Sequence, residues 1–203
     1  MKRDLATKQR ILEAARKVFQ SKGMHGAKMQ DIADTAGINK ALLHYYFRNK
    51  EQLFESVFSE AIQKFLPTIL EVWKSDLPFD KKLARFVNSY IDLLTANPFL
   101  PAFILHEVNQ NPHRLQSLFL KRGAAVIMKN IIGQIQGELK KNGIKSFDPR
   151  QLIVNTLALC VFPFAAKPMI TKIMGMKEKD FQLFIEQRKE IIPPLILESI
   201  KSK

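Results

Sequence analysis

The sequence contains few of the residues that build disulfide frameworks, zinc sites and turn-rich sheets. Its 203 residues include one cysteine, Cys160, which excludes an intramolecular disulfide and a cysteine-rich zinc site and suits a reducing compartment. Eight glycines and ten prolines are too few for the many tight turns of an all-β protein. Because lysine, leucine, isoleucine, alanine and glutamate are good helix formers, we expect an all-α chain.

Long hydrophobic runs are also missing. The first ten residues carry five charges and no apolar stretch of signal-peptide length. The most hydrophobic run, 152–166, contains Asn155, Thr156 and Pro163 and falls short of the roughly 20 apolar residues that a membrane-spanning helix needs. We therefore expect a cytoplasmic protein that does not interact with a membrane, with this run as a buried core helix.

Catalytic and metal-binding signatures are missing as well. The histidines show no paired metal-ligand spacing such as H-x3-H, and they are His25, His44, His106 and His113. The sequence has no phosphate-binding glycine loop, no nucleophile elbow and no paired catalytic carboxylates. We expect no metal, no other cofactor and no enzymatic activity.

Positive charge, by contrast, is abundant. The formal net charge of +13 at pH 7 exceeds what solubility requires, so we expect an anionic partner such as DNA, RNA or an acidic membrane surface. Residues 1–50 hold 11 Lys and Arg against 4 Asp and Glu, whereas the other 153 residues hold 21 against 15. The positive charge is therefore concentrated in the first fifty residues.

The same fifty residues predict three short helices. The first begins near Thr7, carries an apolar stripe at helical spacing and ends at Gly23. The second covers residues 29–36 and stops at Gly37, and the third, capped by Asn39, covers residues 40–46.

The second and third helices have the spacing of a helix-turn-helix. Ala33 is small enough for the helix crossing, Gly37 can adopt a positive φ in the turn, and Leu43 can seat the third helix on the core. Lys40 and His44 lie one turn apart on the third helix, off its apolar face, so they can point into a DNA major groove. A double-stranded DNA partner is therefore predicted.

Further motifs support this interpretation. They are I-L-E-A-A at 11–15, Phe19, Gly23, D-I-A at 31–33, A-G-I at 36–38 and Y-Y-F-x-x-K-E-x-L-F at 45–54. With these motifs, the stretch from 7 to 58 resembles the DNA-binding module of TetR/AcrR-type transcriptional regulators. The resemblance implies a dimer with two such modules, a C-terminal regulatory domain of about six helices, and repression that a ligand relieves.

The resemblance also implies roles for the residues at matching positions. Lys40 and Ala41 would read bases, and four residues would contact phosphates: Asn39, Tyr45, Tyr46 and Lys50. Three positions depart from the family pattern. A threonine usually caps the second helix where this chain has Ala27 and Lys28, and we expect Lys28 to contact a phosphate instead. A glycine is usual in place of Ala41 and a tyrosine in place of His44, so the bases that are read should differ.

The rest of the chain is predicted to form a ligand-binding and dimerisation domain. A helix over 50–66, with an unbroken apolar stripe that ends before Pro67, should connect a DNA-binding domain at 1–50 to a helical domain at 67–203. Prolines mark the boundaries of later helices at Pro78, Asn97-Pro98, Asn111-Pro112 and Asp148-Pro149. We also expect breaks at Pro163, Pro168 and Pro193-Pro194.

A ligand pocket and a dimer interface are predicted within this domain. The candidate pocket residues combine bulky apolar surface with a few polar groups, and they are Phe86, Tyr90, Phe103, His106, Met128, Cys160 and Phe164. A close-packed core is the alternative for each of them. The candidate interface lies on the helix after Pro149 and on the last helix, where its residues are Phe181, Phe184, Ile185, Arg188 and Ile191.

Together these patterns predict a ligand-responsive repressor. It would bind a palindromic operator as a homodimer and be released by a small apolar or amphipathic effector. One alternative is a basic architectural protein that binds nucleic acid without sequence discrimination and takes no ligand. The other is a peripheral membrane protein whose lipid binding survives loss of the first fifty residues.

Overall fold

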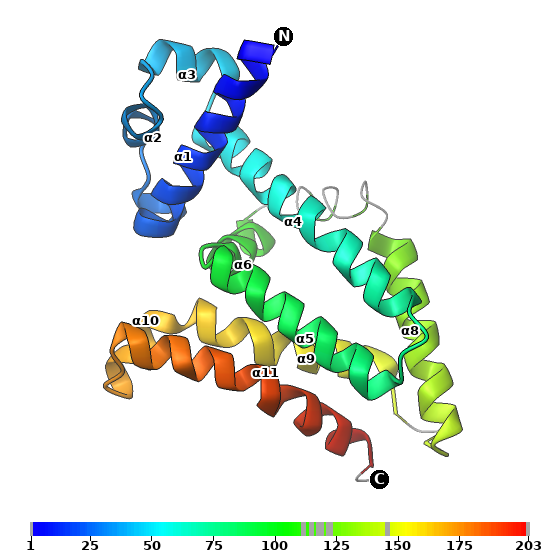
Figure 1. Cartoon of the computed structure of the whole chain (residues 1–203). Helices are drawn as coiled ribbons and strands as arrows, with labels where there is room; N and C mark the ends of the chain where they lie inside the picture. The colour runs from blue at the N-terminus through cyan, green and yellow to red at the C-terminus, as the bar shows by residue number, and fades with distance from the viewer. Residues whose placement is uncertain are drawn as a thin grey trace.

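Every element in the described part of the chain is an α-helix. The computed structural model describes residues 2–110, 113, 116, 120, 124–144 and 147–201 (Figure 1). Helices α1, α2 and α3 gather at one end, and the long helix α4 leads away from them toward α8 (Figure 1). Helices α5, α9 and α11 pack against one another in the other half (Figure 1). The all-α prediction is confirmed.

The N-terminal module consists of α1, α2 and α3 and the start of α4. Its helices span Lys2–Gly26, Met29–Ala36 and Lys40–Tyr46. The predicted second and third helices are confirmed. At Gly23, the predicted end of the first helix, the backbone leaves helical geometry at φ 66° and ψ 176°, but α1 continues to Gly26. The predicted start near Thr7 is wrong, because α1 already begins at Lys2. Its first turns are mostly exposed and have no apolar stripe that would mark the beginning of a helix.

Helix α4, Lys50–Lys74, is longer than the sequence predicted. The helix does not end before Pro67 but continues for two more turns. A proline removes one N–H hydrogen bond and crowds the preceding turn, at a cost of roughly 3 kcal/mol in a helix interior. The exposed Pro67 is nevertheless tolerated, because Val72 and Trp73 beyond it are buried. The division of the chain into domains at residue 67 stays a prediction.

The C-terminal helices follow the predicted boundaries at several points. They are α5 (Phe79–Ala96), α6 (Leu100–Gln110), α8 (Ala124–Lys141), α9 (Pro149–Ala165), α10 (Lys167–Ile173) and α11 (Glu178–Lys201). Asp148 caps α9 as predicted, since its Oδ1 accepts a hydrogen bond of 2.9 Å from the backbone N–H of Arg150. The predicted boundary at Asn111-Pro112 lies outside the described residues.

The prolines in the last three helices have different effects. The chain bends by 70° between α9 and α10, in the predicted region of Pro163 and Pro168. Helix α11, by contrast, passes through Pro193 and Pro194, so the predicted interruption there is wrong. Its apolar stripe continues on both sides of the prolines and holds the helix on the core. No single described helix is long and apolar enough to cross a membrane; α9 and α10 pass that test of length and composition only as a bent pair.

Two hydrophobic cores meet along α4. The first packs α1, α2 and α3 against the first part of α4 and also includes Phe99 and Leu100 at the start of α6. The second packs α5, α8, α9 and α11 around Trp73 from the end of α4. Helix α4 and the start of α6 therefore connect the N-terminal module to the C-terminal helices.

Candidate nucleic-acid interface and effector cavity

The turn between α2 and α3 depends on Gly37. This residue adopts the left-handed conformation with φ 63°, and its N–H donates to the carbonyl of Asp34 at 3.1 Å. Ile38 N–H donates to the Ala33 carbonyl at 3.1 Å, which completes the helix C-cap. Arg10 of α1 donates from Nη2 to the Ala36 carbonyl at 2.6 Å. The turn is thus held by its own backbone and by the first helix.

Replacing Gly37 with alanine is expected to lower the free energy of unfolding by roughly 1 to 2 kcal/mol, because a Cβ disfavours the left-handed conformation. The matched control is Gly137→Ala, since Gly137 lies within α8 and a Cβ there meets no atom within 4 Å. That change should be neutral or stabilising, because alanine is the better helix former. Urea unfolding of both variants checks this, and equal effects would contradict the role of Gly37.

Helix α3 separates a buried face from an exposed face. Leu43 and the following Phe47 are buried in the core of the N-terminal module. Lys40, Ala41 and His44 are exposed on the other side. The helix therefore presents to solvent the three residues that were predicted to set base preference.

The start of α3 is capped by Asn39. Its Oδ1 accepts a hydrogen bond of 2.7 Å from the N–H of Leu42. The Nδ2 of the same amide is a donor that the cap does not use. Asn39 is therefore a capping residue that keeps donor capacity toward an anion.

The start of α2 is capped by Asp31 in place of the usual threonine. Its carboxylate accepts from the backbone N–H of Lys28 at 3.2 Å and forms an ion pair of 2.9 Å with Lys22. The hydrogen bond from Lys22, followed by that from Lys28, lowers the pKa of Asp31. The side chain of Lys28 makes no cap hydrogen bond and is exposed. The capping role of Asp31 was not predicted from the sequence, although Asp31 lies three residues after the N-cap, where a capping carboxylate is expected.

The two tyrosines at the end of α3 lie in different surroundings. Tyr45 is 79% exposed, whereas Tyr46 donates a hydrogen bond from its hydroxyl to Asp4 of α1. That hydrogen bond is the main cause that raises the pKa of Tyr46 above its ordinary value. His44 donates from Nδ1 to the Arg48 carbonyl at 3.1 Å when that nitrogen carries the proton. Asp4 was not anticipated from the sequence.

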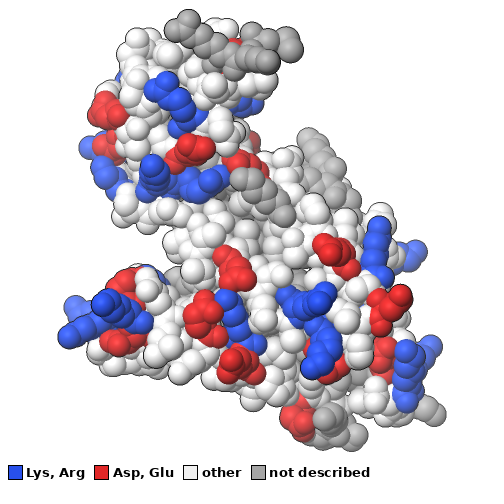
Figure 2. Space-filling model, viewed as in Figure 1, with Lys and Arg blue, Asp and Glu red and all other residues white. Residues whose placement is uncertain are grey.

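The first turn of α4 lies next to the end of α3. Asn49 caps it, since Oδ1 of Asn49 accepts from the N–H of Gln52 at 2.8 Å. Lys50 is the first residue of α4 and is half-buried. On the face seen in Figure 2, Lys and Arg side chains are scattered over the N-terminal module, with acidic side chains among them.

A cavity of about 350 Å³ lies where the two cores meet. Its walls come from α4, α5, α6, α8 and α9. Two of its lining residues carry polar side-chain atoms, Tyr90 and Thr156, apart from the indole nitrogen of Trp73. The Thr156 hydroxyl donates to the Leu152 carbonyl at 2.7 Å, and burial raises the pKa of Tyr90 well above its ordinary value. None of the described residues that line the cavity carries a charged side chain.

The predicted pocket residues are distributed differently. Phe86, Tyr90 and Met128 line the cavity. Cys160 and Phe164 are buried in the second core and are not among the lining residues. Burial raises the pKa of the Cys160 thiol to about 12, so it stays protonated at neutral pH. The side chains of Phe103 and His106 lie outside the described part of the structure.

Most residues of the cavity wall were not predicted from the sequence. The majority of them are aliphatic, such as Ile62, Leu83 and Ile135, and resemble ordinary core residues in a helical pattern. Phe65, Trp73 and Thr156 also line the cavity and were not predicted. Among the described residues, no group of three or more His, Cys, Asp or Glu side chains could hold a metal ion.

An exposed apolar surface runs along α9 and α11, and we call it the α9–α11 face. It consists of Val154, Phe162, Leu183, Ile191 and Leu195, which repeat at four- or eight-residue spacing on each helix. The two helices pack together, and Arg188 of α11 donates from Nη2 to the Leu159 carbonyl of α9 at 2.7 Å.

The predicted interface residues divide between this face and the core. Ile191 belongs to the face, and Phe184 and Arg188 are half-buried beside it. Phe181 and Ile185 are buried within the protomer and have little surface left for a partner.

Comparison with known proteins gives a consistent result. The model of a family described as bacterial regulatory proteins, tetR family, matches residues 11–57. The HTH-type transcriptional regulator RutR of Escherichia coli strain K12 is 25% identical over 212 residues, which cover 98% of this chain and 92% of RutR. Residues 11–57, which match the family model, contain α2, α3 and the turn between them.

Solved structures share the fold. The transcriptional regulator FadR from Bacillus subtilis, in complex with stearoyl-CoA, has a TM-score of 0.63 at 21% identity and covers 91% of this chain and 96% of its own. A transcriptional regulator of the TetR/AcrR family from Thermobifida fusca YX-ER1 has a TM-score of 0.64 at 14% identity, with 92% and 96% covered. The likeness extends over the C-terminal helices as well as the N-terminal module.

Proposed function

Because the chain is a transcriptional regulator of the TetR/AcrR type, we propose that it represses transcription as a homodimer on a palindromic operator until an effector releases it. The observation that carries this proposal is the exposed face of α3, which offers Lys40, Ala41 and His44 while Leu43 and Phe47 hold the helix on the core. A helix anchored in this way can enter a major groove without unfolding. A repressor must reach DNA, so we place it in the cytoplasm, and it acts by binding alone, without catalysis.

In this proposal the exposed face of α3 reads bases and its surroundings contact phosphates. Lys40 suits the acceptors of guanine, Ala41 can contact a thymine methyl group, and His44 offers Nε2 to a base edge. Lys28, Lys50, the Asn39 amide and the Tyr45 hydroxyl would contact phosphates on either side. To contact a phosphate, the Tyr46 hydroxyl must break its hydrogen bond to Asp4 and donate to the phosphate instead.

The Lys40→Ala variant tests the base-reading assignment on an operator selected from random DNA. We expect it to cost about 1 to 3 kcal/mol on the operator and much less on random duplex. The matched control is Lys28→Ala, which should lower the affinity for both duplexes alike. It should also reduce the salt dependence of binding by the amount expected for one phosphate contact per module. Fluorescence anisotropy titrations at several salt concentrations measure both. An equal loss on operator and random DNA in the Lys40 variant would refute base reading by this residue.

We further propose that the cavity between α4, α5, α6, α8 and α9 holds the effector. Its volume lies within the range of roughly 300–1,000 Å³ that is typical of ligand pockets. Because none of the described lining residues is charged, we expect the part of the effector that enters to be uncharged and largely apolar. The solved FadR of Bacillus subtilis holds stearoyl-CoA, which combines an apolar chain with a polar head, and this supports an amphipathic effector for the present chain.

The α9–α11 face is the proposed dimer interface. Five large apolar side chains that are about half exposed or more would stay in water in a monomer, which is unfavourable for a soluble protein. A two-fold axis through this face would bury the same side chains of both protomers. The two α3 helices would then bind half-sites about 34 Å apart or a multiple of that distance.

A further inference from the structure

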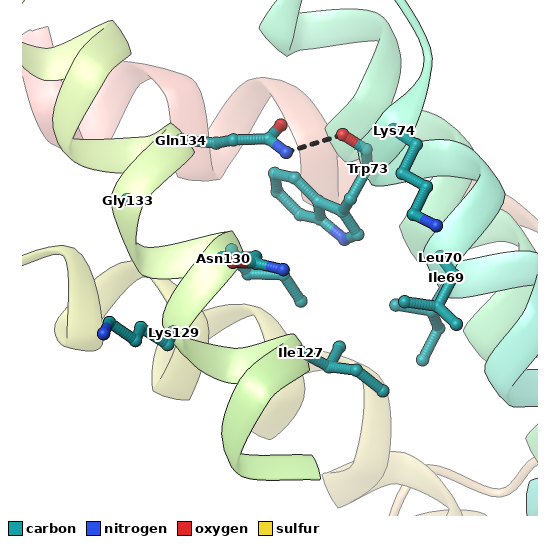
Figure 3. Close-up of a pocket in the computed structure, with 10 residues that line it drawn as sticks. Ile69, Leu70, Trp73, Lys74, Ile127, Lys129, Asn130, Gly133 and Gln134 are labelled. Atoms are coloured by element: carbon teal, nitrogen blue, oxygen red, sulfur yellow. Dashed lines mark hydrogen bonds between the residues drawn. The ribbon is translucent and has the colours of Figure 1, made fainter. Parts of the chain in front are cut away.

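A second hollow lies beside the cavity, between the end of α4 and helix α8. It has a volume of about 400 Å³ and is lined from α4 by Ile69, Leu70, Trp73 and Lys74 (Figure 3). Four residues line both this hollow and the cavity: Ile69, Trp73, Ile127 and Ile131. The two spaces therefore adjoin at these side chains, and the hollow is placed where an opening to the cavity would be.

Trp73 has a buried donor without a partner at this boundary. Its side chain is 6% exposed, and its Nε1 has no hydrogen-bond partner among the described residues. In Figure 3 the nitrogen edge of the indole is turned toward the space between α4 and α8. A buried N–H that lacks an acceptor is unfavourable, so an acceptor brought by a ligand would be stabilised here.

The rim of the hollow is positively charged. Lys74 of α4 and Lys129 of α8 both line it, and no Asp or Glu is among the described lining residues. In Figure 3 Lys74 lies on the α4 side of the gap, whereas the side chain of Lys129 points away from α4. Just behind, Lys82 donates from Nζ to Gln134 Oε1 at 3.0 Å and to the Trp73 carbonyl at 3.3 Å, and both acceptors are neutral. Gln134 in turn donates to the same carbonyl at 2.6 Å. Within the described residues, no carboxylate pairs with any of these three ammonium groups.

We propose that the gap between α4 and α8 is the mouth of the cavity and that the effector is an apolar chain ending in an anionic group. The chain would lie in the apolar cavity, and the carboxylate or phosphate would lie at the rim beside Lys74. One anionic oxygen would accept the hydrogen bond from Trp73 Nε1. This inference rests on the proposed function, since it assumes that the cavity holds the effector.

The test uses three probes with the same twelve-carbon chain: laurate, dodecyl phosphate and dodecanol, each below its micelle-forming concentration. Trp73 is the only tryptophan, so its fluorescence reports binding at the mouth. The Lys74→Glu variant is expected to bind at least one anion about tenfold or more weakly, with dodecanol unchanged. The two anions distinguish a carboxylate head from a phosphate head. Lys140→Glu, which changes the net charge equally at an exposed site away from the mouth, should leave all three affinities unchanged.

A second variant tests the indole donor. Trp73→Phe keeps the ring and removes the N–H, and titration calorimetry should show a several-fold weaker affinity for the anion with no change for dodecanol. If dodecanol binds and charge reversal does not weaken either anion, the assignment of the mouth is overturned while an apolar effector remains supported. If no probe binds, the inference also fails, and operator binding by the unliganded protein then decides separately whether it is a repressor.

Discussion

The double variant Phe162→Glu/Ile191→Glu is expected to be monomeric and to bind the operator about 10²- to 10⁴-fold more weakly than the native protein. Both side chains belong to the α9–α11 face and are 57% and 48% exposed in the protomer, so the substitutions leave its own core intact. Two carboxylates per protomer would have to be desolvated in the interface, which is strongly unfavourable. Without the dimer, the second module loses the high local concentration that the first provides at the adjacent half-site.

Sedimentation equilibrium measures the mass of the variant, and circular dichroism checks that its helices persist. Val126→Glu is the control, because Val126 is an exposed apolar residue of α8 outside the α9–α11 face. It should remain dimeric and retain operator affinity. A double variant that stays dimeric at micromolar concentration would place the interface on another surface.

The N-terminal module could be predicted closely because its signals are local. Gly37 ends α2 and Asn39 caps α3, and each acts within a few residues of its own position. The start of α1 could not be predicted in this way, because the contact between Asp4 and Tyr46 joins residues 42 positions apart. Local chemistry marks where helices end, whereas contacts between distant helices decide how far some of them extend.

The prolines of the helices from α4 onward show the limit of proline as a signal. Pro149 follows a capping Asp and starts α9 as expected, since a proline at the first helical position loses no hydrogen bond. Pro67 and Pro193 were predicted to end helices, yet both lie inside long ones. Burial of the residues that follow, such as Trp73 and Ile196, offsets the lost hydrogen bond. The sequence shows the cost of the proline but not the packing that offsets it.

The cavity was only partly predictable for a similar reason. Phe86 and Tyr90 were predicted, whereas the aliphatic wall and the aromatic residues Phe65 and Trp73 were not. The proposed mouth was not foreseen, because Trp73 and Asn130 are far apart in the sequence and meet only when α4 lies against α8. A surface lysine such as Lys74 has no evident role until the neighbouring hollow is known.

Communication between the cavity and the N-terminal module is expected to pass through the start of α6. Phe99 contacts Phe54 edge-on, with ring centroids 5.5 Å apart, and lies 6.2 Å from Phe19. The next residue, Leu100, lines the cavity. Gln20 of α1 also donates from Nε2 to the Ala96 carbonyl at the end of α5, at 2.7 Å. A ligand that displaces Leu100 would therefore move a side chain that is packed inside the core of the module.

We expect effector and operator to weaken each other's binding by the same factor, roughly 5- to 150-fold, corresponding to a coupling of about 1 to 3 kcal/mol. An effector releases the operator only if it binds better to a dimer whose modules are wrongly spaced for DNA. Titration of a cavity ligand with and without saturating operator measures the factor. Equal affinities, for a compound known to occupy the cavity, would show that this compound is not an inducer.

Phe99→Leu is expected to bring the factor by which effector and operator weaken each other's binding close to one. The variant should still fold and dimerise, and its separate affinities for effector and operator should stay within a few-fold of native. The smaller side chain keeps the site apolar but loses the aromatic contacts to Phe19 and Phe54, so movement of Leu100 no longer shifts the module. Phe181→Leu is the matched control, because it makes the same change at a buried position that neither lines the cavity nor touches the module. It should retain full coupling. Equal coupling in the two variants would mean that the signal reaches the module by another route, such as the apolar stripe of α4 or the hydrogen bond from Gln20 to the Ala96 carbonyl.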